Sequence, residues 1–211
     1  MHEFVQSPGQ LEIICGPIFS GKSEELIRRL RRVELSGKEF LLFKPNLDNR
    51  YEVDSVISHD ARQLKAIATG IDKNALHVIE TIISKFPNAD VVAFDEVNFY
   101  EPQIIELIEK CISRGKRVIA AGLDMDFRGK PFASMAQLLA LADYADKLNA
   151  ICAKCKKNPA TLSQRLVDGK PARWSDAVVK NSPLDVYEPR CRKCHQVTKG
   201  QEVGLDKFPN Q

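Results

Sequence analysis

The sequence predicts an α/β fold, in which a parallel sheet is flanked by helices and followed by a smaller cysteine-rich module. Through the first two-thirds of the chain, short apolar runs alternate with amphipathic helical patterns, which is typical of a parallel sheet covered on both faces. After Leu148 this alternation stops, and cysteine pairs and prolines take its place. We therefore expect a sheet domain at 1–148, a small module at 149–195 and a flexible tail at 196–211.

Each element of the sheet domain is predicted from its hydrophobic pattern. The segments 24–36 and 101–114 carry apolar residues at helical spacing and each is followed by a glycine, so both should be helices. The segment 46–69 fits neither pattern and is expected to be mostly loop. Strands are expected at the apolar runs 11–15, 40–44, 91–95 and 117–121.

Composition and charge narrow the possible function classes. The net charge is only +3, whereas a domain that binds nucleic acid usually carries a strong basic stripe. The densest basic run, 28–32, lies on a predicted helix and is interpreted as its solvated face. No apolar stretch approaches the roughly 20 residues that span a bilayer, and the first ten residues do not resemble a secretory signal. We expect a cytoplasmic protein without nucleic-acid or membrane partners, whose six cysteines are reduced or bind metal.

The strongest motif is Gly16-Pro-Ile-Phe-Ser-Gly-Lys-Ser23, which matches G-x-x-x-x-G-K-[ST] between a predicted strand and a predicted helix. Its backbone N–H groups and the helix amino terminus can cradle phosphates. Lys22 would neutralise the β- and γ-phosphate oxygens, and the Ser23 hydroxyl would bind Mg²⁺. A chance glycine-rich turn is the alternative, and the strand–loop–helix order disfavours it. We expect ATP with Mg²⁺ to bind at Gly16, Pro17, Ile18, Phe19, Ser20, Gly21, Lys22 and Ser23.

A second apolar strand ends in two acids, Asp95 and Glu96. In proteins with such a phosphate loop, a strand of this kind delivers an acid to the metal, so Asp95 is expected in the Mg²⁺ shell, directly or through water. Because side chains alternate along a strand, Glu96 should point to the other side and could take the proton of an incoming hydroxyl. An acid that caps the following helix is the alternative. Val97 and Asn98 complete the expected nucleotide site.

Two cysteine pairs predict a zinc site. Cys152-x-x-Cys155 and Cys191-x-x-Cys194 each have the spacing of a zinc knuckle. Four thiolates fill a tetrahedral site and leave no position for water, so the zinc should be structural. His195 is a competing fourth ligand, and Cys194 is preferred because it keeps the two-residue gap. Free or redox-active thiols are the alternative interpretation.

Together and in this order, the motifs resemble the type II thymidine kinases, a family related to vertebrate cytosolic and many bacterial enzymes. The resemblance extends from about residue 11 to about residue 195 and covers nearly the whole chain. Besides the phosphate loop, the acid pair and the cysteine pairs, it rests on the stretches Asp48-Asn-Arg50-Tyr51, Ser58-His-Asp60, 122–132 and Tyr187-Glu-Pro-Arg-Cys191.

The resemblance implies a thymidine kinase, which transfers the γ-phosphate of ATP to the 5′-hydroxyl of thymidine, and of deoxyuridine, in pyrimidine deoxynucleoside salvage. It implies that Glu96 is the general base, that dTTP acts as a feedback ligand and that the protein is a homotetramer. The loop between the cysteine pairs, called a lasso in this family, would close over the base. The implied nucleoside-binding residues are Asp48, Arg50, Phe99, Leu123, Phe127, Ser163 and Tyr187.

Two departures from the family pattern concern the nucleoside. Asn98 stands where the family usually has glutamine, and Ser182-Pro183 replaces a usual glycine pair in the lasso. Pro183 lacks a backbone N–H, so hydrogen bonds from the lasso backbone to the base should differ here. Two other functions remain open at this point: a zinc-containing ATPase that binds nucleic acid, and a nucleotide-binding regulator.

Overall fold

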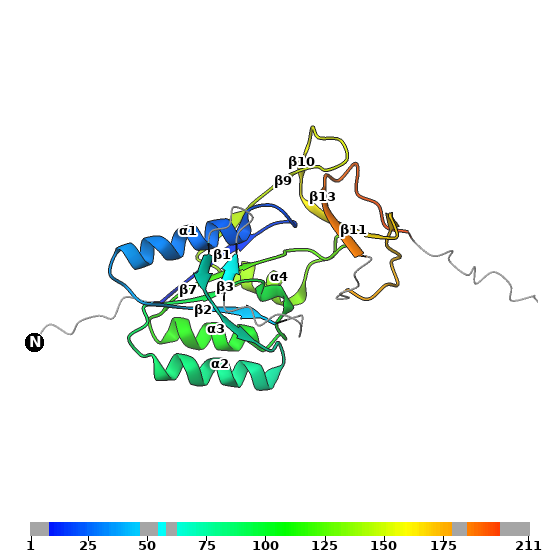
Figure 1. Ribbon diagram of the computed structural model, residues 1–211. Helices are drawn as coiled ribbons and strands as arrows, with labels where there is room; N and C mark the ends of the chain where they lie inside the picture. Colours follow the sequence, from blue (N-terminus) through cyan, green and yellow to red (C-terminus); the bar gives the residue numbers. More distant parts are fainter. Residues whose placement is uncertain (1–8, 47–54, 58–62, 179–184, 199–211) are drawn as a thin grey trace, which may run out of the picture.

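The computed structural model describes residues 9–46, 55–57, 63–178 and 185–198, which form a sheet domain and a smaller module (Figure 1). The sheet domain contains six parallel strands in the order β5-β2-β6-β7-β1-β8. The fold predicted from the sequence is therefore confirmed.

The elements of the sheet domain begin and end close to the predicted positions where predictions were made. Its strands in chain order are β1 Gln10–Cys15, β2 Phe40–Pro45, β5 Ile67–Thr69, β6 Val91–Phe94, β7 Arg117–Gly122 and β8 Tyr144–Lys147. Its helices are α1 Lys22–Leu35, α2 Lys73–Lys85, the short 3₁₀ helix η1 Val97–Phe99, α3 Ile104–Ser113 and α4 Ala133–Leu141.

Alternating side chains of the sheet form two separate core layers. Leu42 of β2 packs with Leu26 and Ile27 of α1 on one face, whereas Phe43, the next residue, packs on the other face with α2, α3 and α4. Strands β6 and β7 divide their side chains in the same way, because residues of a strand point alternately to the two faces. Figure 1 shows α1 on one side of the sheet and α2 with α3 on the other.

The sequence predicts mostly loop at 46–69, but three strands lie in this segment. Strand β5 joins the edge of the central sheet beside β2, and β3 Ser55–Ile57 pairs with β4 Gln63–Lys65 as an antiparallel hairpin. These strands are only three residues long, so they carry too little apolar alternation to be identified from sequence.

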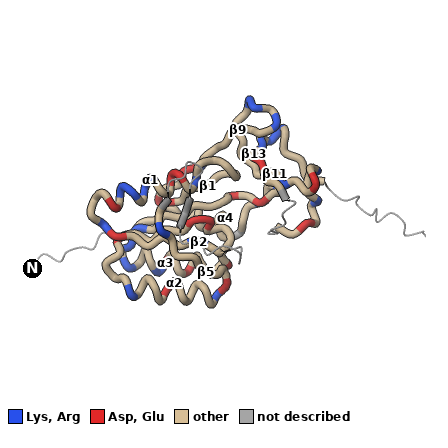
Figure 2. Tube along the Cα trace, viewed as in Figure 1, with Lys and Arg blue, Asp and Glu red and all other residues tan. Residues whose placement is uncertain are grey.

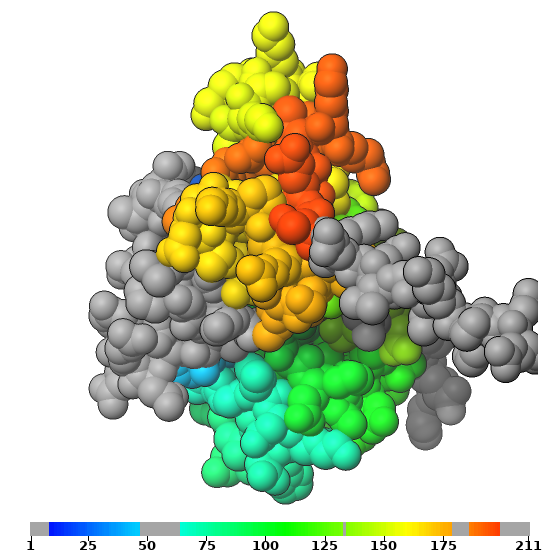
Figure 3. Space-filling model, turned by 90° about the vertical axis from the view of Figure 1, so that its right-hand side faces the viewer, coloured from blue at the N-terminus to red at the C-terminus, as the bar shows by residue number. Residues whose placement is uncertain are grey.

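The module consists of a two-stranded and a three-stranded antiparallel sheet. The first pairs β9 Ala150–Ile151 with β10 Pro159–Ala160; the second has the order β12-β11-β13, with β11 Leu162–Val167, β12 Lys170–Pro171 and β13 Asp185–Arg190. In Figure 3 the module forms the yellow to red surface above the cyan and green surface of the sheet domain. Its hydrogen bonds continue beyond the expected boundary at 195, since the amide N–H of Thr198 donates to the carbonyl of Ala172.

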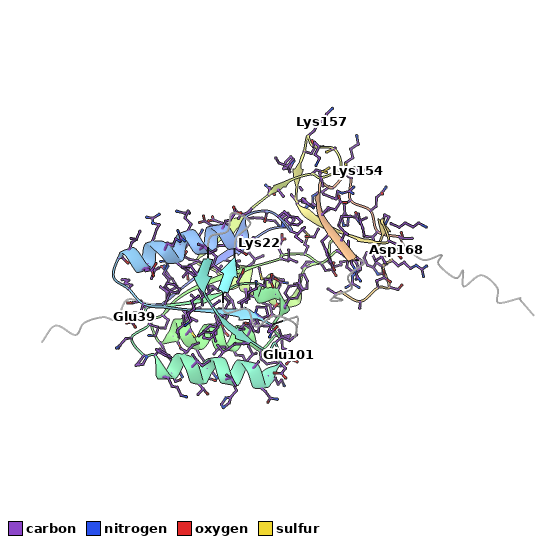
Figure 4. The ribbon with its side chains drawn as sticks, viewed as in Figure 1. Lys22, Glu39, Glu101, Lys154, Lys157 and Asp168 are labelled. Carbon is purple, nitrogen blue, oxygen red and sulfur yellow. The ribbon has the colours of Figure 1, made fainter. Side chains whose placement is uncertain are left out.

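Charge is interspersed over the described residues. Figure 2 shows blue and red segments mixed along the trace, with a short basic stretch at the tip of the module. Lys154 and Lys157 lie at this tip, far from Lys22 of the phosphate loop (Figure 4). Among the residues described, no helix is long and apolar enough to cross a membrane.

Candidate active site and metal centre

A cavity of about 370 Å³ lies at the carboxyl ends of the central strands, under the module. Such an edge of a parallel sheet is the usual place for a ligand site. The cavity brings together fourteen of the residues expected from the sequence: Ile18, Phe19, Ser20, Gly21, Lys22, Ser23, Asp95, Glu96, Asn98, Phe99, Leu123, Phe127, Ser163 and Tyr187. Gly16, Pro17 and Val97 do not line it, and the expected Asp48, Arg50 and Ser182-Pro183 lie outside the described residues.

The phosphate loop connects β1 to α1 and needs glycine at both ends. Gly16 has a φ of 147°, and a Cβ at this position would lie 2.4 Å from the carbonyl oxygen of Leu148. Gly21, with a φ of 83°, precedes α1, and no side chain caps the helix there. The first N–H groups of α1 are therefore available to an anion.

Lys22 and the acid pair stand at the open end of this loop. The ammonium of Lys22 donates to the carbonyl of Pro17 at 2.7 Å, and burial lowers the pKa of this lysine. The Ser23 hydroxyl lies 3.2 Å from both carboxylate oxygens of Asp95. Burial raises the pKa of Asp95, which is only 2% exposed, so a cation here would be favourable. A hydroxyl beside a carboxylate is the oxygen donor set that Mg²⁺ uses in such proteins.

Glu96 lines the same cavity as Asp95, contrary to the expectation that it would point away. Strand β6 ends at Phe94, and Glu96 has a left-handed backbone with a φ of 51°, so strand alternation no longer applies. Burial raises the pKa of Glu96, and the neighbouring Asp95 carboxylate raises it further. A carboxylate with a raised pKa beside a phosphate loop is suited to accept a proton near neutral pH.

Asn98 fastens the turn that carries Glu96 to the end of β7. Its Oδ1 atom accepts a hydrogen bond from the backbone N–H of Leu123 at 2.8 Å, and the side chain is 5% exposed. A Cβ at Gly122 would lie 2.7 Å from this oxygen, so the contact requires glycine there. This contact could not be predicted from the sequence, because it joins residues 25 positions apart.

The module supplies the remaining wall of the cavity. Ser163 of β11 accepts a hydrogen bond from the backbone N–H of Ile18 at 3.0 Å, so it touches the phosphate loop directly. Tyr187 of β13 lines the cavity beside it. Five further cavity residues come from segments that the family resemblance singled out: Gly122, Met125, Asp126 and Phe132 of the stretch 122–132, and Val178 of the lasso. Glu24 and Lys44 also line the cavity, and the sequence did not indicate them. Of these, Lys44 could have been found, because it lies at the carboxyl end of a predicted strand.

The four expected metal ligands come together in the module. One sulfur from each of Cys152, Cys155, Cys191 and Cys194 lies within 4.8 Å of the others. The Cys155 and Cys191 sulfurs are 4.0 Å apart, close to the separation of about 3.8 Å that tetrahedral Zn–S bonds of about 2.3 Å require. The residues present therefore fit a zinc ion.

The arrangement also distinguishes Cys194 from His195 as the fourth ligand. The Nε2 atom of His195 lies 2.9 Å from the carbonyl oxygen of Phe127 in the sheet domain, outside the sulfur cluster. The histidine thus joins the module to the loop after β7.

One comparison with known proteins bears on these observations. The family model described as thymidine kinase matches residues 9–195, which is most of the chain and includes the phosphate loop, the acid pair and all four clustered cysteines.

Proposed function

Because the chain belongs to the thymidine kinase family, we propose that it transfers the γ-phosphate of ATP to the 5′-hydroxyl of thymidine and forms dTMP for DNA synthesis. The observation that carries this proposal is the shared cavity. The phosphate loop, the Asp95–Glu96 pair and several aromatic residues line this one cavity, which supports binding of both a triphosphate and a nucleoside. Deoxyuridine, which lacks only the base methyl group, is proposed as a second acceptor.

The chain's own residues account for the reaction. Glu96 takes the proton of the 5′-hydroxyl while the hydroxyl oxygen forms a bond to the γ-phosphorus. The bond from that phosphorus to the bridging oxygen of ATP breaks, and ADP leaves. Lys22 neutralises charge on the phosphates. Ser23 and Asp95 would hold Mg²⁺, which supplies further charge neutralisation when bound. A covering module excludes water, which otherwise competes with the nucleoside for the phosphoryl group.

The nucleoside half of the site is assigned to the far side of the cavity. Phe127 and Tyr187 offer faces for the pyrimidine, and Phe99 and Leu123 offer apolar contact. Ser163 lies where it can contact both the phosphate loop and the nucleoside. Asp48 and Arg50 remain proposed substrate residues on the family resemblance alone.

The remaining proposals concern the protein's setting. Zinc at the four cysteines is structural, since its ligand set leaves no open position. We further propose a cytoplasmic homotetramer with dTTP as feedback ligand. These three features rest on the family.

The proposal is tested by measuring ATP-dependent phosphorylation of a panel of nucleosides, with Glu96→Gln as the catalytic control. Transfer to thymidine is expected, and the variant should lose roughly 10²–10⁴-fold in turnover because it cannot accept the proton. A folded Glu96→Gln enzyme with normal turnover would remove Glu96 from the base role. Absence of transfer to every nucleoside would overturn the proposed function.

A further inference from the structure

Strand β11 connects the module to both halves of the active site. Successive side chains of a strand point to opposite faces, so Ser163 and Arg165 share one face. Ser163 touches the phosphate loop, and Arg165 reaches Phe127 in the loop after β7. Gln164, which lies between them, instead pairs with the backbone of Gln196 at 2.7 and 2.8 Å.

Arg165 is the largest fully buried side chain among the described residues, at 2% exposure. Its guanidinium carbon lies 5.4 Å from the centroid of the Phe127 ring, within cation–π range. Its Nη1 atom donates a hydrogen bond to the carbonyl oxygen of Ala177 at 2.6 Å. One guanidinium therefore holds a ring of the sheet domain and the backbone of a module loop at the same time.

Both contacts of Arg165 involve a residue that lines the cavity or is next to one that does. Phe127 lines it, and so does Val178, the residue next to Ala177. On the neighbouring strand, Tyr187 lies opposite Arg165 in the β11–β13 register and also lines the cavity. Arg165 thus contacts one residue of the nucleoside wall, holds the backbone next to a second and lies opposite a third on the neighbouring strand, although it does not line the cavity itself.

A second cation contacts the same ring but cannot replace this link. The guanidinium of Arg128 lies 5.6 Å from the Phe127 ring and is ion-paired to Asp126 at 2.7 Å. Arg128 belongs to the same loop as Phe127, so this contact does not tie the ring to β11. Arg165 reaches the ring from the module.

We propose that Arg165 is a positioning residue for the pyrimidine nucleoside, which fixes Phe127 and the Ala177–Val178 backbone as opposite parts of the base pocket. This inference rests on the proposed function. The role requires a guanidinium, because its planar group stacks on a ring while its edge donates a hydrogen bond. A lysine ammonium is a point charge and cannot hold both partners in this geometry.

The test is steady-state kinetics of Arg165→Lys with thymidine and with ATP varied in turn. Because the ammonium can reach only one of the two partners, the thymidine KM should rise about tenfold, the size of one lost cation–π contact or hydrogen bond. The ATP KM and kcat should stay within about twofold, because Lys22 and Glu96 are untouched. Arg165→Gln, whose amide carries no charge and is too short to reach Ala177, removes both contacts and gives the same readout should the lysine variant not fold.

Arg190→Lys is the matched control. Arg190 is a half-buried arginine of the same small sheet, which pairs with Glu188 at 2.8 Å and donates to the Cys194 carbonyl at 3.5 Å without lining the cavity. Its variant should leave the thymidine KM unchanged. Zinc content and unfolding temperature are measured for all variants, so that a damaged module is recognised.

Three results would overturn the inference: an unchanged thymidine KM in a folded Arg165 variant, an equal rise in the ATP KM, or an equal effect of Arg190→Lys. Phe127→Leu adds an independent check. If Arg165 acts through this ring, the double variant should raise the thymidine KM by less than the product of the two single effects. If the wild type phosphorylates no nucleoside, the proposed function itself fails. This outcome differs from an active wild type whose thymidine KM is unchanged in the Arg165 variants.

Discussion

Replacing Asn98 with alanine should destabilise the protein, because it breaks the contact between the acid-bearing turn and the end of β7. The N–H of Leu123 would lose its acceptor at a position where Asn98 is 5% exposed. A buried donor without a partner costs about 1–3 kcal/mol. For a chain of this size, each kcal/mol lowers the unfolding temperature by about 2–4 °C, so a decrease of about 2–12 °C is expected.

The neighbouring glycine makes this prediction specific. A methyl group at Gly122 would lie 2.7 Å from Asn98 Oδ1, so Gly122→Ala should cost about 1–3 kcal/mol by overpacking. In the Asn98→Ala background that oxygen is gone, and the nearest atoms to the methyl group are the backbone nitrogen of residue 98 and Val97 Cγ1, both at 3.2 Å. The double variant should therefore be less destabilised than the sum of the two single variants.

These effects are measured by thermal unfolding of the wild type, the two single variants and the double variant. Asn88→Ala, at an exposed asparagine, is the control. Turnover should fall together with stability in Asn98→Ala, since Glu96 lies on the turn that Asn98 fastens. This role of Asn98 is refuted if Asn98→Ala unfolds at the wild-type temperature, or if Gly122→Ala lowers the unfolding temperature equally in both backgrounds.

Two further predictions concern pH and metal. Burial and the neighbouring Asp95 raise the pKa of Glu96 above 4.5, the ordinary pKa of this group. As the pH falls, kcat/KM should therefore already decline above pH 4.5, because the protonated acid cannot accept the 5′-hydroxyl proton. An acid limb at or below pH 4.5 would contradict that role. Protein purified without chelators should contain one zinc per chain, and a strong chelator should lower its unfolding temperature. The chelator should also raise the thymidine KM more than the ATP KM, because Cys152 and Cys191 join segments that carry the nucleoside wall. Zinc-free protein with normal stability would disprove the metal site.

The phosphate half of the site was predictable because its determinants are local. Gly16 to Ser23 form one continuous motif between a strand and a helix, and Asp95 and Glu96 directly follow an apolar run. What the sequence did not predict is the left-handed backbone at Glu96. The strand ends one residue before Asp95, and the left-handed backbone at Glu96 depends on the turn held by Asn98.

Some elements were missed although signals for them exist, and others carry no signal. Helix α2 is capped by Asp72, whose side chain accepts a hydrogen bond from the N–H of Ala75 at 2.8 Å, and the apolar residues of the helix have helical spacing. That start could have been recognised. Strand β8 differs, since all four of its residues are exposed and no apolar run marks it. It is defined by its pairing with β1, which only the folded chain reveals.

The nucleoside half of the site depends on contacts between distant parts of the chain, and this has a consequence for function. Ile18 contacts Ser163, and Phe127 contacts both Arg165 and His195, so the module and the sheet domain both contribute to that half. Because the zinc ligands flank β11 and β13 in sequence, any change that loosens the cysteine cluster should reach the base pocket before it reaches the phosphate loop, which is built into β1 and α1. Variants of the module that leave Ser163 in place should therefore alter selection of the nucleoside while they spare binding of ATP.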